Sequence, residues 1–317
     1  MKIVFMETDT LGTDVDLSMF NEFGDVIMYN YSDPNNNAER IKDADIIVVN
    51  KIPVNEALLK DATSVKLICL SATGTNNVDF EYTGKHGIKV ANARGYSTDS
   101  VAQHTFAMFF YLYEKLRKYD DFVKSGEYSD YHMFSCFEPH FNELSGKTWG
   151  IIGLGAIGRK VADIAAAFGC KVIYYSASGN TYECNYERCE FDYLLKNSDI
   201  ISIHCPLTEK TTNLIDRNAL DLMKSSAVLL NLARGPVVCE KDLADALNLG
   251  KIAAAGLDVM CTEPLPKNSP LMDIKDSTRL LITPHLAWGT CEARQRCANE
   301  VYENIKAYIN NTDRNIV

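Results

Sequence analysis

The chain has 317 residues, of which 46% are hydrophobic, and this size and composition predict two domains, each with its own core. The formal net charge of -10 excludes the usual nucleic-acid-binding proteins, because a phosphate-binding surface needs clustered Lys and Arg. The N-terminal run MKIVFMETDT begins as a strand, and no apolar stretch approaches the ~18 residues that span a bilayer. We therefore expect a cytoplasmic protein without nucleic-acid or membrane partners.

The ten cysteines contain no CxxC pair. Cys69, Cys170 and Cys205 lie in apolar, strand-like runs, where a thiol packs as a small hydrophobe, and this usage is typical of a reducing compartment. Cys184 and Cys189 share a polar loop, but no second Cys or His pair stands at ligand spacing. The sequence thus predicts no metal site.

The first hundred residues alternate short apolar strands with helix-length connections, which indicates a parallel sheet covered on both faces. The strands are KIVFME, DVIMYN, ADIIVVN, VKLICLS and IKVANA. Asp99 and Ser100 then cap a long helix through VAQHTFAMFFYLYEKLRKYDDFVKSG, which is predicted to end near Gly126. We interpret this helix as the crossing to a second α/β unit and as part of a subunit contact.

An aromatic-rich connection over 127–147 leads into a second run of strands and helices. Its strands include KVIYY, DIISIHCPL, AVLLNLA, AAAGLDV and LLITPHLA, as expected for a doubly wound domain of about 190 residues. The amphipathic final helix, 292–310, has no strand after it and is expected to return to the first unit. We predict a discontinuous substrate domain, residues 1–99 and 289–317, and a dinucleotide-binding domain, residues 100–288.

The stretch Thr148–Gly158, TWGIIGLGAIG, passes from an apolar strand into Gly153, Gly155 and Gly158 in the GxGxxG spacing. The first glycine permits a tight turn, the second lets the backbone approach a pyrophosphate, and the third lets helix and strand pack closely. The amides at the start of the next helix, at Ala156 and Ile157, then face the phosphate charge. A structural glycine turn is the alternative, but the flanking strand and helix favour dinucleotide binding.

Three ionisable residues each follow a strand of the second unit. Arg234 comes after AVLLNLA, Glu263 after GLDV and His285 after LLITP. Ligands of open parallel sheets sit at the carboxyl ends of the strands, so these three residues form the candidate site. Taken singly, each is equally compatible with an ordinary strand-end residue.

Five motifs, GLGAIG, HCPLT, NLARGPVV, LDVMCTEP and TPHLAWGT, resemble the D-isomer-specific 2-hydroxyacid dehydrogenases in order and spacing. The match covers essentially the whole chain. The Asn50-Lys51 turn, the YYSASG strand end and the HLAWGT segment are most similar to the glycerate dehydrogenase (hydroxypyruvate reductase) branch. The resemblance implies two doubly wound α/β domains, a Rossmann dinucleotide-binding domain and a smaller flavodoxin-like substrate domain, with a cleft between them, in a homodimer.

The reaction of that family explains the three residue types. Hydride transfer to a 2-oxoacid builds negative charge on the carbonyl oxygen, which a fixed guanidinium and a proton donor must meet. Arg234 is suited to grip the carboxylate and polarise the carbonyl. His285 is suited to donate the proton, and Glu263 to orient its ring and favour the imidazolium.

The resemblance assigns further contacts by position. Arg234 and His285 touch both cofactor and substrate, and Lys51, Thr73 and Gly74 join them at the substrate, with a simple Gly turn and a solvated lysine as the alternatives. Thr73 also approaches the nicotinamide. The other residues implied at the cofactor are Cys205, Pro206, Thr211, Leu232, Ala233 and Asp258. His204 ends a strand but receives no catalytic role.

One position departs from the NAD fingerprint, which places Asp or Glu about eighteen residues beyond the last glycine to bind the ribose 2′-hydroxyl. Ser176 stands there, followed by Ala177, Ser178, Gly179 and Asn180. No carboxylate of this run rejects a 2′-phosphate and no arginine attracts one. We expect NAD as the cofactor, bound at Ser176, with NADP as the alternative.

The expected activity is reduction of hydroxypyruvate or glyoxylate to D-glycerate or glycolate. A dehydrogenase for another 2-oxoacid, such as pyruvate or phenylpyruvate, stays open. So does a non-catalytic, dinucleotide-sensing corepressor-like protein, because such relatives can retain the Arg, Glu and His.

Overall fold

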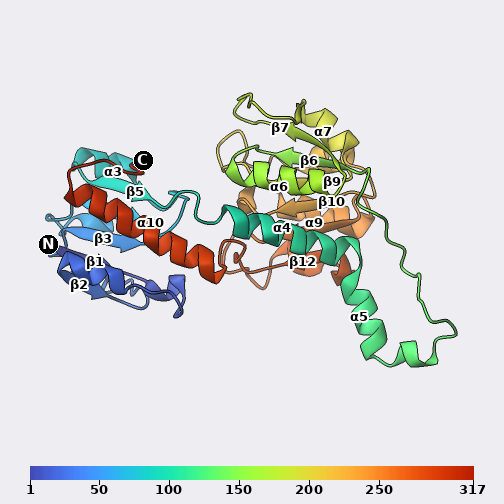
Figure 1. Ribbon diagram of the computed structural model, residues 1–317, viewed down its shortest axis with the longest axis horizontal. Coiled ribbons are helices and arrows are strands. Elements are labelled where there is room, and N and C mark those ends of the chain that lie inside the picture. The colour runs from blue at the N-terminus through green and yellow to red at the C-terminus, as the bar shows by residue number, and fades with distance from the viewer. The chain divides into compact units, whose positions relative to one another are not determined.

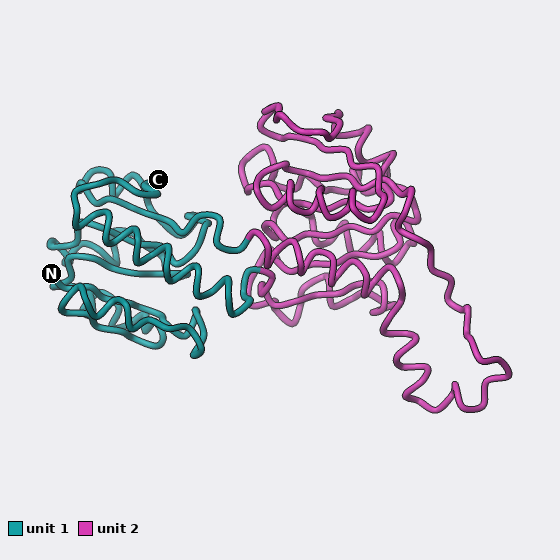
Figure 2. Tube along the Cα trace, viewed as in Figure 1, with its two compact units in different colours: residues 1–97, 288–317 teal, residues 98–287 magenta.

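The computed structural model describes residues 1–317 (Figure 1). The chain divides into two compact units, which Figure 2 colours separately. Unit 1 contains Met1–Ser97 and Trp288–Val317, and unit 2 contains Thr98–Ala287. Two chain crossings thus join the units, after Ser97 and after Ala287. None of the helices combines the length and the apolar character needed to cross a membrane.

Unit 1 is built on five parallel strands in the order β2-β1-β3-β4-β5. The strands are β1 (Lys2–Phe5), β2 (Asp25–Met28), β3 (Ile46–Val49), β4 (Leu67–Leu70) and β5 (Lys89–Asn92). The helices are α1 (Asn37–Ile41), α2 (Glu56–Leu59), α3 (Phe80–Lys85) and α10 (Cys291–Ile309).

The sheet of unit 1 is buried on both faces. Ile3 and Phe5 of β1 share a core with Ile305 of α10, whereas Val4 packs in a second core with Leu58 of α2. Successive side chains of a strand point to opposite faces, so a strand between two helical layers is apolar throughout. The C-terminal helix therefore completes the layer that the first 97 residues leave uncovered.

Unit 2 is built on seven parallel strands in the order β12-β11-β10-β9-β6-β7-β8. The strands are β6 (Thr148–Ile152), β7 (Lys171–Tyr175), β8 (Glu187–Arg188), β9 (Ile200–Ile203), β10 (Val228–Asn231), β11 (Ala254–Leu257) and β12 (Leu280–Ile282). The helices are α4 (Thr98–Tyr113), α5 (Leu116–Lys124), α6 (Ala156–Ala167), α7 (Phe191–Asn197), α8 (Arg217–Leu222) and α9 (Glu240–Leu249). The predicted fold class of two parallel-sheet α/β domains is confirmed.

The expectation of one helix continuing to Gly126 is wrong. Lys115 has a left-handed backbone with φ of 59°, and it separates α4 from α5. Half of α4 is buried, with Phe106 and Phe109 against Trp149, whereas α5 buries no residue. Figure 1 shows α5 leaving the sheet of unit 2, so the helix breaks where its packing surface ends.

Candidate active site

The chain order of the seven-stranded sheet reverses between β6 and β9, and open parallel sheets bind ligands outside the strand ends at such a point. Gly153 follows β6 and Cys205 follows β9. Gly153 has φ of 94°, and a Cβ there would lie 2.7 Å from the backbone nitrogen of Cys205. The GLGAIG turn and the HCP segment, which are 52 positions apart at Gly153 and Cys205, therefore pack directly together at the reversal point.

The other two glycines of the motif, Gly155 and Gly158, have different surroundings. A Cβ on Gly158 would lie 2.1 Å from the carbonyl oxygen of Gly153, so only glycine allows α6 to approach the turn. A Cβ on Gly155 would meet no atom within 4 Å, and α6 starts at the next residue, Ala156. This open space before the exposed amides of a 12-residue helix fits a pyrophosphate, with Ile157 in the same first turn.

The ribose end of this edge holds a feature that the sequence did not reveal. Ser176 follows β7 and is only 5% exposed. Just beyond its loop, Arg188 donates a 2.8 Å hydrogen bond to Thr181, and the Arg159 guanidinium lies 5.0 Å from the ring centre of Tyr182. Two guanidinium groups thus reach the segment after the serine. They come from β8 and α6, so the run from Ser176 to Asn180 held no signal for them.

Two side chains with buried polar atoms, those of His204 and Thr211, lie in the segment after β9. Both ring nitrogens of His204 are buried and have no hydrogen-bond partner, and burial lowers the pKa of this imidazole to about 3. Sequence reasoning set His204 aside, yet it supplies the clearest unsatisfied polar atoms at this edge. Thr211 is 1% exposed and donates a 2.7 Å hydrogen bond to the carbonyl of Pro206, so its side chain shapes the turn after Cys205.

The three predicted catalytic residues follow three neighbouring strands, β10, β11 and β12. The Nδ1 atom of His285 lies 2.7 Å from Oε2 of Glu263. The second oxygen of Glu263 accepts a 3.0 Å hydrogen bond from the backbone N–H of Met260. The structure therefore brings imidazole and carboxylate into direct contact, with the carboxylate anchored on its own loop.

Arg234 lies on the adjacent loop. Its Nη1 donates a 2.7 Å hydrogen bond to the carbonyl of Ala233, and its own carbonyl accepts one from Asn231 at 2.9 Å. A Cβ on Gly235 would lie 1.9 Å from the carbonyl carbon of Met260. The loops that carry Arg234 and Glu263 are therefore in backbone contact, which holds these two residues on one edge. Leu232 and Ala233 are buried in the same loop.

Asp258 is 1% exposed and holds the segment that carries His285. Its two oxygens accept hydrogen bonds from the backbone N–H groups of Leu286 (3.0 Å) and Ala287 (2.9 Å). One of them also accepts from the hydroxyl of Thr283, at 2.5 Å. These bonds span His285, whose backbone is left-handed with φ of 53°. The contact of Asp258 with the nicotinamide stays a prediction.

Unit 1 carries the predicted substrate residues Lys51, Thr73 and Gly74. The carbonyl of Thr73 accepts a 2.7 Å hydrogen bond from Asn92, and its hydroxyl donates one of 2.8 Å to the carbonyl of Ala93. The end of β5 therefore fixes the predicted carboxylate-binding loop.

A second set of bonds ties this loop to Lys51. The Nδ2 atom of Asn77 donates to the carbonyls of Asn50 (3.3 Å) and Ile52 (2.8 Å), and one oxygen of Glu7 accepts from the backbone nitrogen of Lys51 at 2.7 Å. The sequence did not reveal these roles of Glu7 and Asn77. Their partners lie more than 20 residues away in the chain, and no local sequence pattern predicts such a contact.

The chain is similar to known proteins over its whole length. The family model described as "D-isomer specific 2-hydroxyacid dehydrogenase, NAD binding domain" matches residues 106–287. A hydroxypyruvate reductase of Blautia hydrogenotrophica is 35% identical, with 100% of this chain and 99% of the relative covered. A glycerate dehydrogenase of Methylorubrum extorquens is 34% identical, with 100% and 98% covered.

Among solved structures, an acyclic imino acid reductase (Bsp5) in complex with NADPH and D-Arg superimposes with a TM-score of 0.90. Its identity is 28%, and both chains are covered completely. The resemblance drawn from the five motifs is thus confirmed. The chain belongs to the D-isomer-specific 2-hydroxyacid dehydrogenases, a family of NAD-dependent oxidoreductases.

Proposed function

We propose that this protein reduces hydroxypyruvate or glyoxylate to D-glycerate or glycolate, with Arg234, Glu263 and His285 as its catalytic residues. The single observation that carries the proposal is the 2.7 Å contact between His285 and Glu263, at the strand ends of a nucleotide-binding sheet. The full-length relatives called hydroxypyruvate reductase and glycerate dehydrogenase favour these substrates.

The reduced nicotinamide, when bound, supplies a hydride to the carbonyl carbon of the oxoacid. Arg234 binds the substrate carboxylate and polarises the carbonyl through charge-assisted hydrogen bonds. His285 gives a proton from Nε2 to the carbonyl oxygen as negative charge develops there. The Glu263 carboxylate at Nδ1 stabilises the protonated ring and keeps it in one orientation.

Unit 1 contributes binding rather than proton transfer in this proposal. The backbone amides near Thr73 and Gly74 receive the substrate carboxylate, and Thr73 approaches the nicotinamide. The ammonium of Lys51 meets the polar substituent of the substrate. The bonds that Asn77 and Asn92 donate, and the bond that Glu7 accepts from Lys51, support this assignment, since they keep both loops in a defined conformation.

We propose NAD over NADP, because the matching family domain is an NAD-binding domain. The neutral Ser176 and the nearby Arg159 and Arg188 keep NADP as the competitor, and an NADPH complex exists for a structural relative. The ratio of kcat/KM for NADH and NADPH with one oxoacid decides between them. A hundredfold preference for NADPH would reverse this choice.

The activity is tested by following oxidation of NADH and NADPH with hydroxypyruvate, glyoxylate, pyruvate and phenylpyruvate. We expect the highest kcat/KM with hydroxypyruvate or glyoxylate. The substitution His285→Ala should lower kcat by roughly 10²–10⁴-fold while cofactor affinity stays close to that of the wild type. Turnover of His285→Ala at the wild-type rate would remove the catalytic assignment, and cofactor binding without any turnover would favour a nucleotide sensor.

We further propose that the protein works as a cytoplasmic homodimer. Buried free cysteines, such as Cys69 in β4 and Cys205 after β9, fit a reducing compartment. The segment after α5 exposes Phe134 (90%), Phe137 (65%) and Phe141 (53%), and monomers rarely expose so many aromatic side chains together. A second copy of the chain is the partner we assign to this segment.

A further inference from the structure

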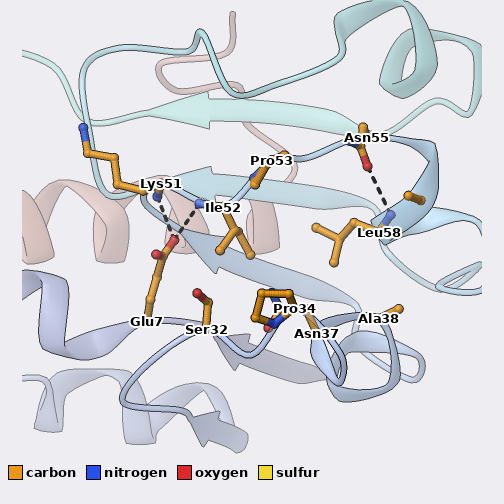
Figure 3. A pocket seen from close by; sticks show the side chains of 11 residues that line it. Glu7, Ser32, Pro34, Asn37, Ala38, Lys51, Ile52, Pro53, Asn55 and Leu58 are labelled. Atoms are coloured by element: carbon orange, nitrogen blue, oxygen red, sulfur yellow. Dashed lines mark hydrogen bonds between the residues drawn. The ribbon is translucent and has the colours of Figure 1, made fainter. Parts of the chain in front are cut away.

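The sheet of unit 1 has a reversal point of its own, and a pocket lies there. In the order β2-β1-β3-β4-β5 the strands that follow β1 in the chain are added first on one side, at β2, and then on the other, from β3 onward, so the strand order reverses between β1 and β3. A pocket of about 420 Å³ is lined by residues that follow three strands, including Glu7 after β1, Ser32 after β2 and Lys51 after β3 (Figure 3). Doubly wound sheets of this strand order bind ligands at this position, and the volume lies within the range of small-molecule sites.

The acidic group of this pocket is unusually well fixed. Glu7 is 8% exposed, and its Oε1 accepts hydrogen bonds from the backbone nitrogens of Asn50 (2.6 Å), Lys51 (2.7 Å) and Ile52 (3.2 Å). Figure 3 shows two of these bonds. Its Oε2 accepts none, so a buried carboxylate keeps one oxygen for a donor from outside the protein. A hydrogen bond to a buried charged group is among the stronger kinds in proteins.

Two side-chain amides of the pocket, those of Asn37 and Asn55, are oriented as donors. The Oδ1 atom of Asn37 accepts from the backbone nitrogen of Asp33 (2.8 Å), and that of Asn55 accepts from Leu58 (3.3 Å). Because these bonds occupy the carbonyl oxygens, they orient each side-chain amide and leave its NH₂ group as the donor. Lys51 lines the pocket with its backbone, and Figure 3 shows its side chain pointing away from the other lining residues.

Apolar side chains complete the lining. Ile52, Pro53 and Leu58 contribute hydrocarbon surface to the lining. The pocket therefore offers one anionic acceptor, two amide groups that donate to an anion, and room for a short apolar chain. This combination complements a molecule that carries an ammonium group, a carboxylate and a small aliphatic side chain.

We propose that this pocket is a binding site for a free α-amino acid with a small apolar side chain, whose ammonium group binds Glu7 and whose carboxylate binds the amides of Asn37 and Asn55. No covalent step is involved. The site uses residues of unit 1 alone and does not depend on the proposed reductase activity. The same Glu7 carboxylate also accepts a hydrogen bond from the backbone nitrogen of Lys51, so the bound amino acid would share this carboxylate with the loop after β3.

The test is isothermal titration of the full chain with L-valine and D-valine as probes. Two matched compounds each lack one charged group: 3-methylbutanoate has no ammonium, and isobutylamine has no carboxylate. We expect at least one valine enantiomer to bind with a Kd of about 1 mM or tighter, and both comparison compounds to bind at least about tenfold more weakly.

Variants locate the binding. Glu7→Gln keeps an oxygen for the three amides but removes the charge, and Ala57→Trp fills the pocket from an exposed position of α2 without touching Glu7. Each should weaken valine binding by about tenfold or more. The control Glu56→Gln removes a carboxylate of the same helix that does not line the pocket, and it should bind as the wild type does.

The results separate this proposal from the reductase assignment. The substitution His285→Ala should abolish turnover and leave valine binding unchanged. Valine that binds no more tightly than 3-methylbutanoate would overturn the proposal. So would wild-type affinity in folded Glu7→Gln and Ala57→Trp, or loss of binding in His285→Ala, which would place the amino acid in the catalytic site.

Discussion

Two of the contacts that Glu263 makes serve one purpose. Its Oε1 is held by the backbone N–H of Met260, and its Oε2 lies 2.7 Å from the ring of His285. A carboxylate that is fixed on its own loop resists rotation of the imidazole that it contacts. Asp258 adds to this order by holding the backbone on the C-terminal side of His285.

We expect Glu263→Gln to lower kcat for oxoacid reduction by roughly 10²-fold or more, because the ring loses a charged partner while the volume of the side chain is kept. Steady-state kinetics with hydroxypyruvate measure this. Glu240→Gln is the matched control, since that carboxylate binds the backbone of Cys261 and has no bond to His285. Equal activity of the two variants would contradict the role of Glu263.

His204 predicts a pH dependence of stability. Burial lowers the pKa of this histidine to about 3 in the folded protein, below the ordinary histidine value of ~6.5. Between these values the unfolded chain binds a proton that the folded chain does not. The free energy of unfolding should therefore fall as the pH drops through this window, by up to about 1.4 kcal/mol per pH unit for this one group.

Urea unfolding at about pH 7.5 and about pH 5 measures this effect. The variant His204→Leu should lose less free energy of unfolding over that interval than the wild type, because its folded and unfolded states bind the same number of protons at this position. His140→Gln changes an exposed histidine and should behave as the wild type does. An unchanged pH dependence in His204→Leu would show that the folded ring can be protonated.

At the scale of elements, glycines set how closely the loops at the strand ends approach. Gly153 permits the contact of the β6 and β9 ends, and Gly235 permits the contact of the β10 and β11 ends. Each strand end is thereby packed against its neighbour's. The candidate residues hence lie on loops whose backbones support one another.

A pair of alanine substitutions separates packing from ligand approach. Gly235→Ala places a Cβ 1.9 Å from the carbonyl carbon of Met260, so we expect a loss of about 1–3 kcal/mol in the free energy of unfolding and a lower kcat. Gly155→Ala meets no atom within 4 Å, so stability should hold while KM for the dinucleotide rises. Thermal unfolding and cofactor titration distinguish these outcomes, and a destabilised Gly155→Ala would contradict them.

At the scale of the whole molecule, the segment after α5 is the feature that a monomer leaves unexplained. Its aromatic side chains stand in a part of unit 2 that Figure 1 shows extending from the sheet. Only Phe141 among the three exposed phenylalanines has a ring partner, Tyr119, at 6.0 Å. Apolar surface of this kind is stabilised when a second copy covers it.

We expect the double substitution Phe134→Ser and Phe137→Ser to convert a dimer into a monomer in sedimentation velocity, because it removes most of the exposed aromatic surface of the segment. Tyr31→Ser, at a 70% exposed aromatic side chain of unit 1, is the control and should leave the dimer intact. A wild-type protein that sediments as a monomer would refute the dimer proposal.

The amino-acid sequence by itself determined the fold class, the strands along the chain except the short edge strand β8, and the identity of the candidate catalytic residues. These inferences depend on patterns that lie within a few consecutive residues: apolar runs, GLGAIG, and ionisable side chains placed directly after strands. Local patterns of this kind can be recognised without knowledge of the tertiary packing. The sequence did not predict the break at Lys115, because the residues after it still favour a helix although the buried surface of α4 has ended.

Only the tertiary structure decided which distant residues meet. The contact of Gly153 with Cys205, the approach of Arg188 to the loop after Ser176, and the bonds of Glu7 to residues 50–52 all join segments that are separated in the chain. Such contacts follow from strand register and from the packing of both faces of a sheet, which the periodicity of one segment does not contain.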